Sequence, residues 1–351
     1  MASLIPSRPF VLLFVLVCTA ILLSRQPCFD PSHIHHITDA DIRVTQTLPR
    51  LNFSKSHHEF YASEAARSLC AAHGYSVFKP RSDASNGRRK IYDLFMVNTE
   101  LDFLEIRVKT LHDYVDHFVI VEAPLTFQGG PKNLTIRDNW NRFEAHHDKM
   151  IYHQLEYPKD FKPLRHWDRE DLQRNAMFEQ VFPKLTGEQI PAQGDVILVA
   201  DVDEVPRPAT MLVLRTCNFP RRLTLSSKFY YYSFQFLHDG PEWPFPQATY
   251  YPLRQYCLEI CGPAMQVFPY YAIWRRMASF SHAWMNRGSF RNRDRIASAV
   301  RQGVDLWGRK VDTFTRVDNN IDLPGCLLED RERFRYMVDR DGVTAGFTDY
   351  P

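Results

Sequence analysis

The feature that most constrains the fold is an alternation of short apolar runs with segments of helical periodicity in the middle of the 351-residue chain. Asp195–Ala200 (DVILVA) is apolar throughout after its first residue, as a strand covered on both faces is. Earlier runs with a similar strand-like character are Tyr92–Asn98, His117–Ala123 and, more weakly, Met150–Glu156. The segments with helical spacing between them are Glu100–Asp116, Arg137–Asp148 and Trp167–Leu185. This β-α-β-α-β-α-β series predicts an α/β fold with a mostly parallel sheet and right-handed crossovers.

The C-terminal half differs from the preceding region in amino-acid composition. Arg222–Phe236 (RLTLSSKFYYYSFQF) is aromatic and predicts a strand, and Gly240–Pro252 is rich in proline, tryptophan and tyrosine. A helix is expected near Arg293–Gln302 in an otherwise charged, loop-rich region. There is no internal repeat and no long linker, so we interpret residues 91–351 as one domain.

Composition excludes several classes of function. The net charge of +2 is too balanced for a dedicated nucleic-acid binder, which would carry a basic excess. Glycine is scarce, at 14 residues, and neither G-x-G-x-x-G nor G-x-x-x-x-G-K-[ST] occurs. Any phosphate bound by this chain therefore needs another source of positive charge.

The first 26 residues predict targeting to a membrane or to the secretory pathway. Arg8 precedes Phe10–Leu23, fourteen uncharged residues, which is short of the roughly 20 that a full span prefers. No clear A-x-A cleavage site follows, so we favour an uncleaved signal anchor with the rest of the chain in the lumen. The alternative is a cleaved signal peptide, which would make the product secreted.

Residues 27–90 are interpreted as a lumenal stem, because they are polar and show no sustained periodicity. Their histidines are read as part of a solvated tether rather than as metal ligands. Two sequons fit a secretory address, at Asn52 and Asn133. Six cysteines lie outside the apolar run, an even number that makes disulfides plausible while leaving their pairing open. Cys257 and Cys261 have no second pair of metal-type spacing, so zinc is not expected.

The chemistry is expected at the end of the fourth strand, which runs into Asp201-Val202-Asp203-Glu204-Val205-Pro206. In an open α/β sheet, ligands bind beyond the carboxyl ends of the strands. Asp201 and Asp203 alternate with Val202, so in an extended backbone both carboxylates would point the same way. Such oxygen ligands suit Mn²⁺, or Mg²⁺, which could hold a diphosphate leaving group. A turn capped by acidic residues is the alternative.

Several stretches resemble one family in the right order over roughly residues 91–350. They are Tyr92–Arg107, Val119–Gly130, Trp167–Asn175, Asp195–Pro206, Tyr230–Gln247 and Phe280-Ser281-His282. The chain resembles glycosyltransferase family 17, as a fungal-type member. The resemblance implies a GT-A-type nucleotide-binding sheet with an aromatic C-terminal half on the acceptor side, type II Golgi topology, a UDP-GlcNAc donor, Mn²⁺ and inversion at the anomeric carbon. It also implies transfer of GlcNAc to a mannose of an N-glycan in a β-1,4 linkage.

One segment departs from the family pattern. A Gly-Trp-His-Cys segment usually precedes the Ser-His of the family, but here Tyr270–Arg276 leads almost directly into Met277–His282. This departure motivates the alternative of a non-catalytic, glycan-binding member.

Candidate site residues follow from the chemistry. Inverting transfer needs a general base facing the acceptor, and Glu242 is preferred over Asp239. His282 is a candidate third metal ligand beside Asp201 and Asp203, with a structural histidine as the alternative. The candidates for contact with the donor are Asn98, Glu100, Glu122, Arg174 and Asp201. For Asn98 the alternative is helix capping, and for Arg174 it is a surface salt bridge.

A rival enzyme class is an aspartyl phosphatase, because D-x-D-x-V after an apolar strand also fits that motif. In those enzymes the strand that leads into this motif is normally the first strand of the domain. Here three β/α units come first, so this class ranks behind glycosyl transfer.

Overall fold

The computed structural model describes residues 61–79, 88–165, 167–251, 288, 292–310 and 313–339. The helices and strands in chain order are α4 (Glu64–Ala72), β1 (Ser76–Val77), β2 (Ile91–Val97), α5 (Leu101–Leu111), β3 (His117–Glu122), α6 (Thr135–Asp138), η2 (Trp140–His146), β4 (Met150–Gln154), α7 (Asp168–Ala176), η3 (Met177–Val181), η4 (Phe182–Lys184), η5 (Gly187–Gln189), β5 (Val196–Asp201), α8 (Pro208–Thr216), β6 (Cys217–Asn218), β7 (Leu223–Thr224), β8 (Phe236–His238), β9 (Gln247–Tyr250), α10 (Arg293–Gln302), β10 (Phe314–Arg316), α11 (Gly325–Glu329) and α12 (Arg335–Val338).

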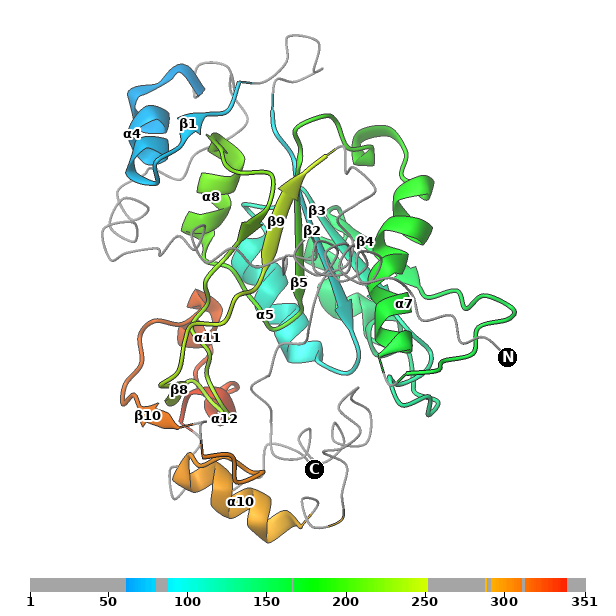
Figure 1. The fold of residues 1–351 in the computed structure, drawn as a ribbon, viewed down its shortest axis with the longest axis vertical. Helices are drawn as coiled ribbons and strands as arrows, with labels where there is room; N and C mark the ends of the chain where they lie inside the picture. The colour runs from blue at the N-terminus through cyan, green and yellow to red at the C-terminus, as the bar shows by residue number, and fades with distance from the viewer. Residues whose placement is uncertain are drawn as a thin grey trace, which may run out of the picture. The chain divides into compact units, whose positions relative to one another are not determined.

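The central sheet has six strands in the order β4-β3-β2-β5-β9-β7 (Figure 1). The pairs β3–β4, β2–β3 and β2–β5 are parallel, whereas β9 is antiparallel to both β5 and β7. The expected α/β fold with a mostly parallel sheet is therefore confirmed. The chain leaves β2 toward β3 and β4 and then returns to place β5 on the other side of β2, so the strand order reverses between β2 and β5.

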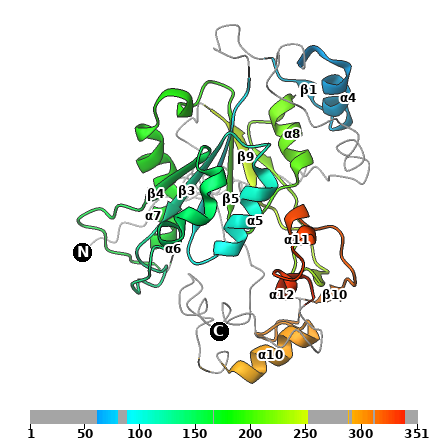
Figure 2. The ribbon, with the colours of Figure 1, turned by 180° about the vertical axis from the view of Figure 1, so that it is seen from behind.

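Strands β2, β3 and β5 are buried on both faces because helices cover both sides of the sheet, whereas the edge strand β4 is only partly buried. On one face, Phe95, Phe118 and Leu198 pack with residues of α5 and α8. On the other face, Leu94 and Val119 pack with residues of α7 and η3. Figures 1 and 2 show α5 and α7 on opposite sides of the sheet. This double cover explains the near-continuous apolar runs in the sequence.

The four expected parallel strands and the helix at Arg293–Gln302 are confirmed, but two other predictions need correction. The helix predicted at Arg137–Asp148 is split into α6 and the 3₁₀ segment η2, with Phe143 in a non-helical conformation. The strand predicted at Arg222–Phe236 is wrong for most of its length, since only β7 and the first residue of β8 are in strands. Tyr232 has a φ of 62°, which breaks an extended backbone. Tyr230, Tyr231 and Tyr232 of this segment are buried although they lie outside regular strands.

The interpretation of residues 27–90 as a solvated tether is wrong for residues 61–78. Helix α4 begins at the capping residue Ser63, whose hydroxyl accepts a hydrogen bond from the Ala66 N–H at 3.1 Å. A disulfide joins Cys70 to Cys217 just after α8, and β1 pairs antiparallel with β6. Leu69 packs with Leu212 and Val213 of α8. This segment is therefore part of the folded unit that contains the sheet.

The predicted anchor at Phe10–Leu23 lies outside the described residues. No helix in the part of the chain that the structure describes is long and apolar enough to cross a membrane.

Candidate active site

The carboxyl edge of the sheet gathers most of the sequence-predicted residues. In the strand register, Val97 pairs with Glu122 and Met96 pairs with Asp201, so the ends of β2, β3 and β5 are level. The strand order reverses between β2 and β5, and such a reversal is where open α/β sheets bind ligands. Asn98 and Glu100 follow β2 at this edge, as expected.

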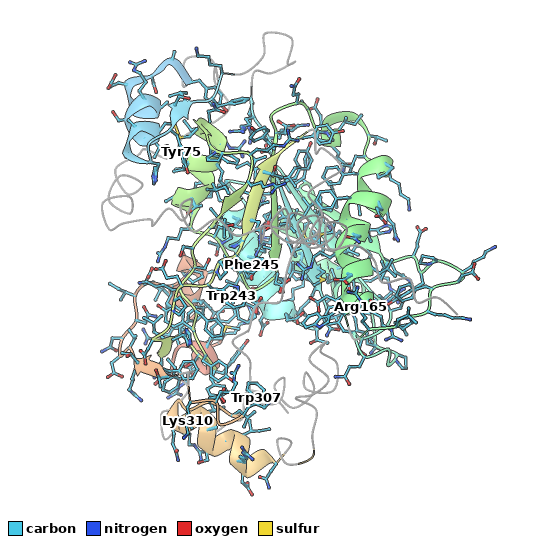
Figure 3. All side chains as sticks on the ribbon, viewed as in Figure 1. Tyr75, Arg165, Trp243, Phe245, Trp307 and Lys310 are labelled. Atoms are coloured by element: carbon cyan, nitrogen blue, oxygen red, sulfur yellow. A yellow bond between two sulfur atoms is a disulfide. The ribbon has the colours of Figure 1, made fainter. Side chains whose placement is uncertain are left out.

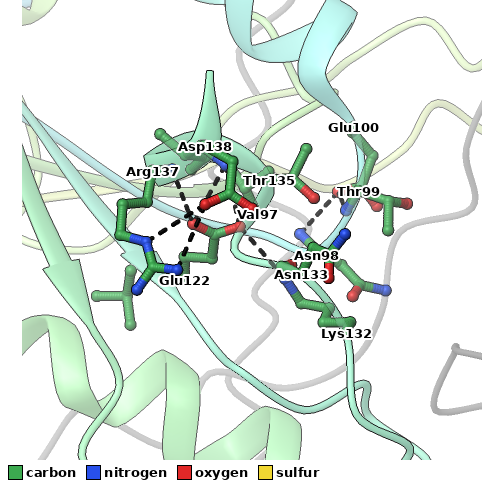
Figure 4. A network of polar contacts seen from close by, with 12 residues as sticks. Val97, Asn98, Thr99, Glu100, Glu122, Lys132, Asn133, Thr135, Arg137 and Asp138 are labelled. Carbon is green, nitrogen blue, oxygen red and sulfur yellow. Dashed lines mark hydrogen bonds and ion pairs between the residues drawn. The ribbon is translucent and has the colours of Figure 1, made fainter. Parts of the chain in front are cut away.

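Glu122 holds the loop that follows β3 (Figure 4). Its side chain is fully buried and accepts hydrogen bonds from the Ile136 N–H at 3.1 Å and the Tyr152 hydroxyl at 3.0 Å. Lys132 pairs with the same carboxylate at 3.3 Å. Burial lowers the pKa of Lys132, and the charge of Glu122 opposes that shift. Glu122 thus caps the start of α6, and the sequon residue Asn133 is exposed immediately before that helix.

Glu100 shapes the turn between β2 and α5. Its Oε2 accepts hydrogen bonds from the backbone N–H groups of Asn98 at 2.8 Å and Thr99 at 2.9 Å. A residue that sequence reasoning missed, Gln173 of α7, donates from Nε2 to the Val121 carbonyl at 2.8 Å. The ends of β2 and β3 are therefore fixed by side chains from both neighbouring helices.

Arg174 of α7 holds the first aspartate of the Asp-x-Asp segment. Its Nη2 lies 3.0 Å from Asp201 Oδ1 and 3.0 Å from Glu170 Oε1, and all three residues are buried. Burial by itself lowers the pKa of Arg174, but the charges of Asp201 and Glu170 more than offset it, so that pKa lies above its ordinary value. The alternative of a surface salt bridge for Arg174 is therefore wrong, because the pair is buried.

A second arginine that sequence reasoning missed, Arg107 of α5, clamps the same segment from the opposite face. Its Nη1 donates to the backbone carbonyls of Asp201 at 3.0 Å and Glu204 at 2.9 Å. Its Nε and Nη2 form a bidentate pair with Asp93 of β2, at 2.8 and 2.6 Å. The charged Asp93 within the apolar run IYDLFMV was the one available signal of such a buried partner.

The extended backbone expected from Asp201 through Asp203 is wrong, because β5 ends at Asp201 and a turn follows. Glu204 closes this turn, since its Oε2 accepts the Asp201 N–H at 2.8 Å. Its Oε1 accepts the indole N–H of Trp243 at 2.8 Å. Burial, reinforced by the charge of Asp201, raises the pKa of Glu204 well above its ordinary value.

A cleft of about 520 Å³ opens beside this turn, and we call it the Trp243 cleft. Its lining includes Asp203, Glu204, Ser226, Glu242 and Trp243, the α5 and α8 residues Thr110, Tyr114 and Val213, and His73 and Tyr75 from the α4–β1 segment. Arg207 and Lys228 also line it, and both pair with Asp322, Lys228 at 2.8 Å. Hydrogen bonds from Arg207, and the pairing with Lys228, lower the pKa of Asp322 to about 2.

The structure separates the two candidate bases. Glu242 is exposed, lines the Trp243 cleft with Asp203, and accepts a hydrogen bond from the Ser226 hydroxyl. Asp239 is not among the residues that line the cleft and instead belongs to the β8–β10 ribbon, where it accepts the Thr315 hydroxyl at 2.5 Å. That hydrogen bond lowers the pKa of Asp239, which moves it away from the value suited to a base near neutral pH.

The chemistry of Asp201 and Asp203 fits a hard divalent cation. Among the described residues, histidine, cysteine, aspartate and glutamate form no group of three or more placed to hold a metal ion. Mg²⁺ does not require one, because it is usually bound by one or two carboxylates together with substrate phosphates and waters. His282 and Asn52 lie outside the described residues.

Comparison with a solved structure adds a distant likeness. The mannosyltransferase PcManGT from Pyrobaculum calidifontis, in complex with GDP-Man and Mn²⁺, matches 84% of this chain and 72% of its own at 11% identity and a TM-score of 0.29. A likeness at that level carries no conclusion about fold or function.

Two curated relatives are similar in sequence over a short stretch. The human β-1,4-mannosyl-glycoprotein 4-β-N-acetylglucosaminyltransferase is 28% identical over 129 residues, which are 36% of this chain and 24% of the human protein. The Rattus norvegicus protein of the same name is 27% identical over 36% of this chain and 23% of its own length. The match thus spans about a quarter of these relatives.

The family comparison covers far more of the chain. The sequence model of glycosyltransferase family 17 matches residues 5–343, which include the whole sheet, the Asp-x-Asp segment and the Trp243 cleft. The resemblance expected from the sequence motifs is confirmed by this match, and the chain belongs to glycosyltransferase family 17.

Proposed function

We propose that this protein is a metal-dependent, inverting glycosyltransferase that moves GlcNAc from UDP-GlcNAc to a mannose of an N-glycan, forming a β-1,4 linkage. The observation that supports this most is the placement of Asp203, Glu242 and Trp243 in one cleft beside the turn that follows β5. Membership of family 17 and the names of the curated relatives support the choice of sugar and acceptor. Nucleic acid is not expected as a partner at a net charge of +2.

The donor end of the site is assigned to the edge between β2 and β5. Asn98, Glu100 and Glu122 shape the turns that a nucleoside would meet, and Arg174 fixes Asp201. Asp201 and Asp203 would hold Mn²⁺, or Mg²⁺, which neutralises a diphosphate leaving group when bound. Arg107 and Glu204 hold the backbone of this segment in place before substrate arrives.

Glu242 is assigned the role of general base. As the acceptor hydroxyl oxygen forms its bond to the anomeric carbon, the bond from that carbon to the diphosphate oxygen breaks, and Glu242 takes the hydroxyl proton. The leaving group departs as UDP. The exposed carboxylate of Glu242 in the cleft is suited to this role, whereas Glu204 uses both oxygens in hydrogen bonds to the protein.

We also propose a Golgi location with type II single-pass topology, with the anchor within residues 1–26 and the catalytic unit in the lumen. Asn133 is an exposed sequon in that unit and would carry a glycan. A secreted product is the outcome if the N-terminal segment is cleaved.

A purified lumenal protein, incubated with a panel of UDP-sugars with Mn²⁺ or with EDTA, tests the proposal. Hydrolysis or transfer specific to UDP-GlcNAc that requires Mn²⁺ is the expected result. Binding of glycans without turnover of any nucleotide sugar would favour the non-catalytic alternative instead.

A further inference from the structure

A chain without a glycine-rich phosphate loop needs side-chain cations to bind a diphosphate. The two arginines at the carboxyl edge of the sheet are already matched by carboxylates, Arg107 by Asp93 and Arg174 by both Asp201 and Glu170. All of these residues are buried. A diphosphate at this edge therefore needs a further cation that is open to the ligand.

Two such cations line the Trp243 cleft together with Asp203. Among the described residues, Arg207 and Lys228 are the arginine and the lysine in that lining. Both pair with Asp322, so the three side chains together carry one net positive charge. The hydrogen bonds from Arg207 and Lys228 lower the pKa of Asp322 to about 2, and the same contact raises the pKa of Lys228. All three groups therefore stay charged at neutral pH.

Asp322 is fixed by a bidentate ion pair and by its own backbone. Arg207 donates to both of its carboxylate oxygens, from Nη2 at 2.6 Å. The Asp322 N–H donates to Asn320 Oδ1 at 2.9 Å, and Asn320 Nδ2 donates in turn to the Phe234 carbonyl at 2.9 Å. The carboxylate that accepts from Lys228 is therefore held in place before any ligand binds.

Lys228 has hydrogen-bond donors to spare. An ammonium group carries three N–H donors, and Nζ of Lys228 donates to Asp322 Oδ2 at 2.8 Å. Within the described residues, Nζ has no second hydrogen bond or ion pair. The Lys228 side chain is 47% exposed and lines the cleft, so its remaining donors are accessible to a ligand. Arg207, by contrast, uses two of its nitrogens on Asp322.

The residues next to Lys228 connect it to the Asp-x-Asp segment. Ser227 exchanges backbone hydrogen bonds with Trp243 at 2.9 and 2.8 Å, and its hydroxyl donates to the Phe245 carbonyl at 2.6 Å. Figure 3 shows Trp243 and Phe245 next to one another, with ring centroids 5.6 Å apart. The indole N–H of Trp243 donates to Glu204 in the turn after β5. Lys228 therefore follows directly on a bridge that is hydrogen-bonded to this turn.

We propose that the Lys228 ammonium, positioned by Asp322 and Arg207, donates hydrogen bonds to the diphosphate of the nucleotide-sugar donor. The inference rests on the proposed function for the identity of the donor. As the bond from the anomeric carbon to the diphosphate oxygen breaks, its electron pair goes to that oxygen. Lys228 keeps its proton and stabilises the added negative charge through the hydrogen bond. An acceptor that carries a phosphate or carboxylate would present similar chemistry, and the experiments below distinguish it from the donor.

Calorimetric titration of the full-length protein with UDP, GDP and uridine, in the presence of Mn²⁺, tests the inference. Lys228→Met removes the ammonium and keeps an unbranched side chain, so the affinity for UDP should fall by about 10-fold or more. Uridine carries no phosphate, and its affinity should be unchanged. Lys228→Arg restores the positive charge and should recover most of the affinity for UDP. The urea unfolding midpoint should stay that of the wild type, because a half-exposed ion pair contributes little to stability.

Lys184→Met is the matched control. Lys184 pairs with Glu156 at 2.7 Å, is 58% exposed and does not line the cleft. The variant therefore loses the same charge and a similar ion pair at another site, and its affinity for UDP should equal that of the wild type.

The inference is overturned if Lys228→Met binds UDP as tightly as the wild type, or if Lys184→Met loses as much affinity. A change confined to the KM of an anionic acceptor, with normal UDP binding, would assign Lys228 to the acceptor and also overturn it. Hydrolysis of UDP-GlcNAc by the wild-type protein reports on the proposed function separately. Loss of UDP or GDP affinity in Lys228→Met supports the inference whichever sugar is transferred, and a wild-type protein that binds neither nucleotide refutes it.

Discussion

Replacing Arg107 with methionine should destabilise the protein strongly. The Arg107 guanidinium and the Asp93 carboxylate are both 0% exposed, and they form a bidentate pair at 2.6 and 2.8 Å. Removing one member leaves the other charge buried without its partner, which typically costs about 3–5 kcal/mol. A domain is stable by only about 5–15 kcal/mol in total, so this is a large fraction. Equilibrium urea unfolding followed by tryptophan fluorescence measures the loss.

A second variant separates the charge pair from the hydrogen bonds to the Asp-x-Asp segment. In Asp93→Leu/Arg107→Met both charges are removed, so most of the lost stability should return, to within about 1–2 kcal/mol of the wild type. The carbonyls of Asp201 and Glu204 still lack their donor. Donor KM and kcat should therefore stay impaired in the double variant although its fold is restored.

The control is Arg165→Met, since Arg165 pairs with Asp168 and Asp171 at 71% exposure. Exposed ion pairs contribute little to stability, so its unfolding midpoint should match the wild type. If Arg107→Met also unfolds at the wild-type urea concentration, the reasoning about the buried pair is refuted. If the double variant regains full transfer activity, the arginine does not position the Asp-x-Asp segment.

Three further outcomes follow from the site and the N-terminus. Asp203→Ala should abolish transfer and Mn²⁺-dependent UDP binding with the fold intact. The control variant Asp160→Ala, in an exposed loop, should retain both activities. Transfer by Asp203→Ala in the presence of EDTA would exclude the metal role. Glu242→Gln should lower kcat by about 10²–10⁴-fold with donor affinity nearly unchanged, and Asp239→Asn should have a smaller effect, as steady-state kinetics will show. With an uncleaved anchor at residues 10–23, the protein should remain in the membrane pellet after a carbonate wash. A soluble product whose N-terminus lies near residue 26 would contradict the anchor.

Strands β2, β3 and β5 were predictable because burial on both faces leaves a signal in each strand by itself, and the partly buried β4 gave a weaker one. Strand β9 was not, because Gln247–Tyr250 (QATY) has no apolar run and its place beside β5 depends on the rest of the sheet. The aromatic run before it has high β-propensity, but packing in turns around Tyr231 and Tyr232 prevails over that propensity.

The placement of the candidate residues at one edge of the sheet was predictable, and the contacts among them were not. The rule that ligands bind at the carboxyl edge needs only the strand order, and it correctly gathers Asn98, Glu122 and Asp201. The pair of Asp93 with Arg107 depends on which face of β2 meets α5, and this is set by tertiary packing. The hydrogen bond from Trp243 to Glu204 joins residues 39 positions apart in the chain, and Trp243 is held by an antiparallel bridge to Ser227 that the sequence did not reveal.

The segment before the sheet is where the sequence-based prediction and the structure differ most clearly. Sequence alone places the start of the catalytic domain at residue 91, but several buried contacts cross that boundary. The Tyr61 hydroxyl donates to the Arg215 carbonyl at 3.3 Å, and Arg89 donates to the carbonyls of Leu214 at 3.0 Å and Cys217 at 2.7 Å. Arg89 is 2% exposed and lies 4.2 Å from the ring centroid of Phe78.

A fragment of residues 91–351 should therefore fail to fold, whereas a fragment of residues 60–351 should fold. Loss of a native disulfide typically costs about 2–5 kcal/mol, and the shorter fragment also loses the contacts of Tyr61, Leu69 and Arg89. Together these losses approach the whole stability of a domain. Cys70→Ser/Cys217→Ser in the longer fragment isolates the disulfide and should lower stability while leaving the fold detectable by circular dichroism. If the 91–351 fragment instead unfolds at the same urea concentration as the longer one, residues 61–78 are a tether and the α4–β1 segment has no part in the fold.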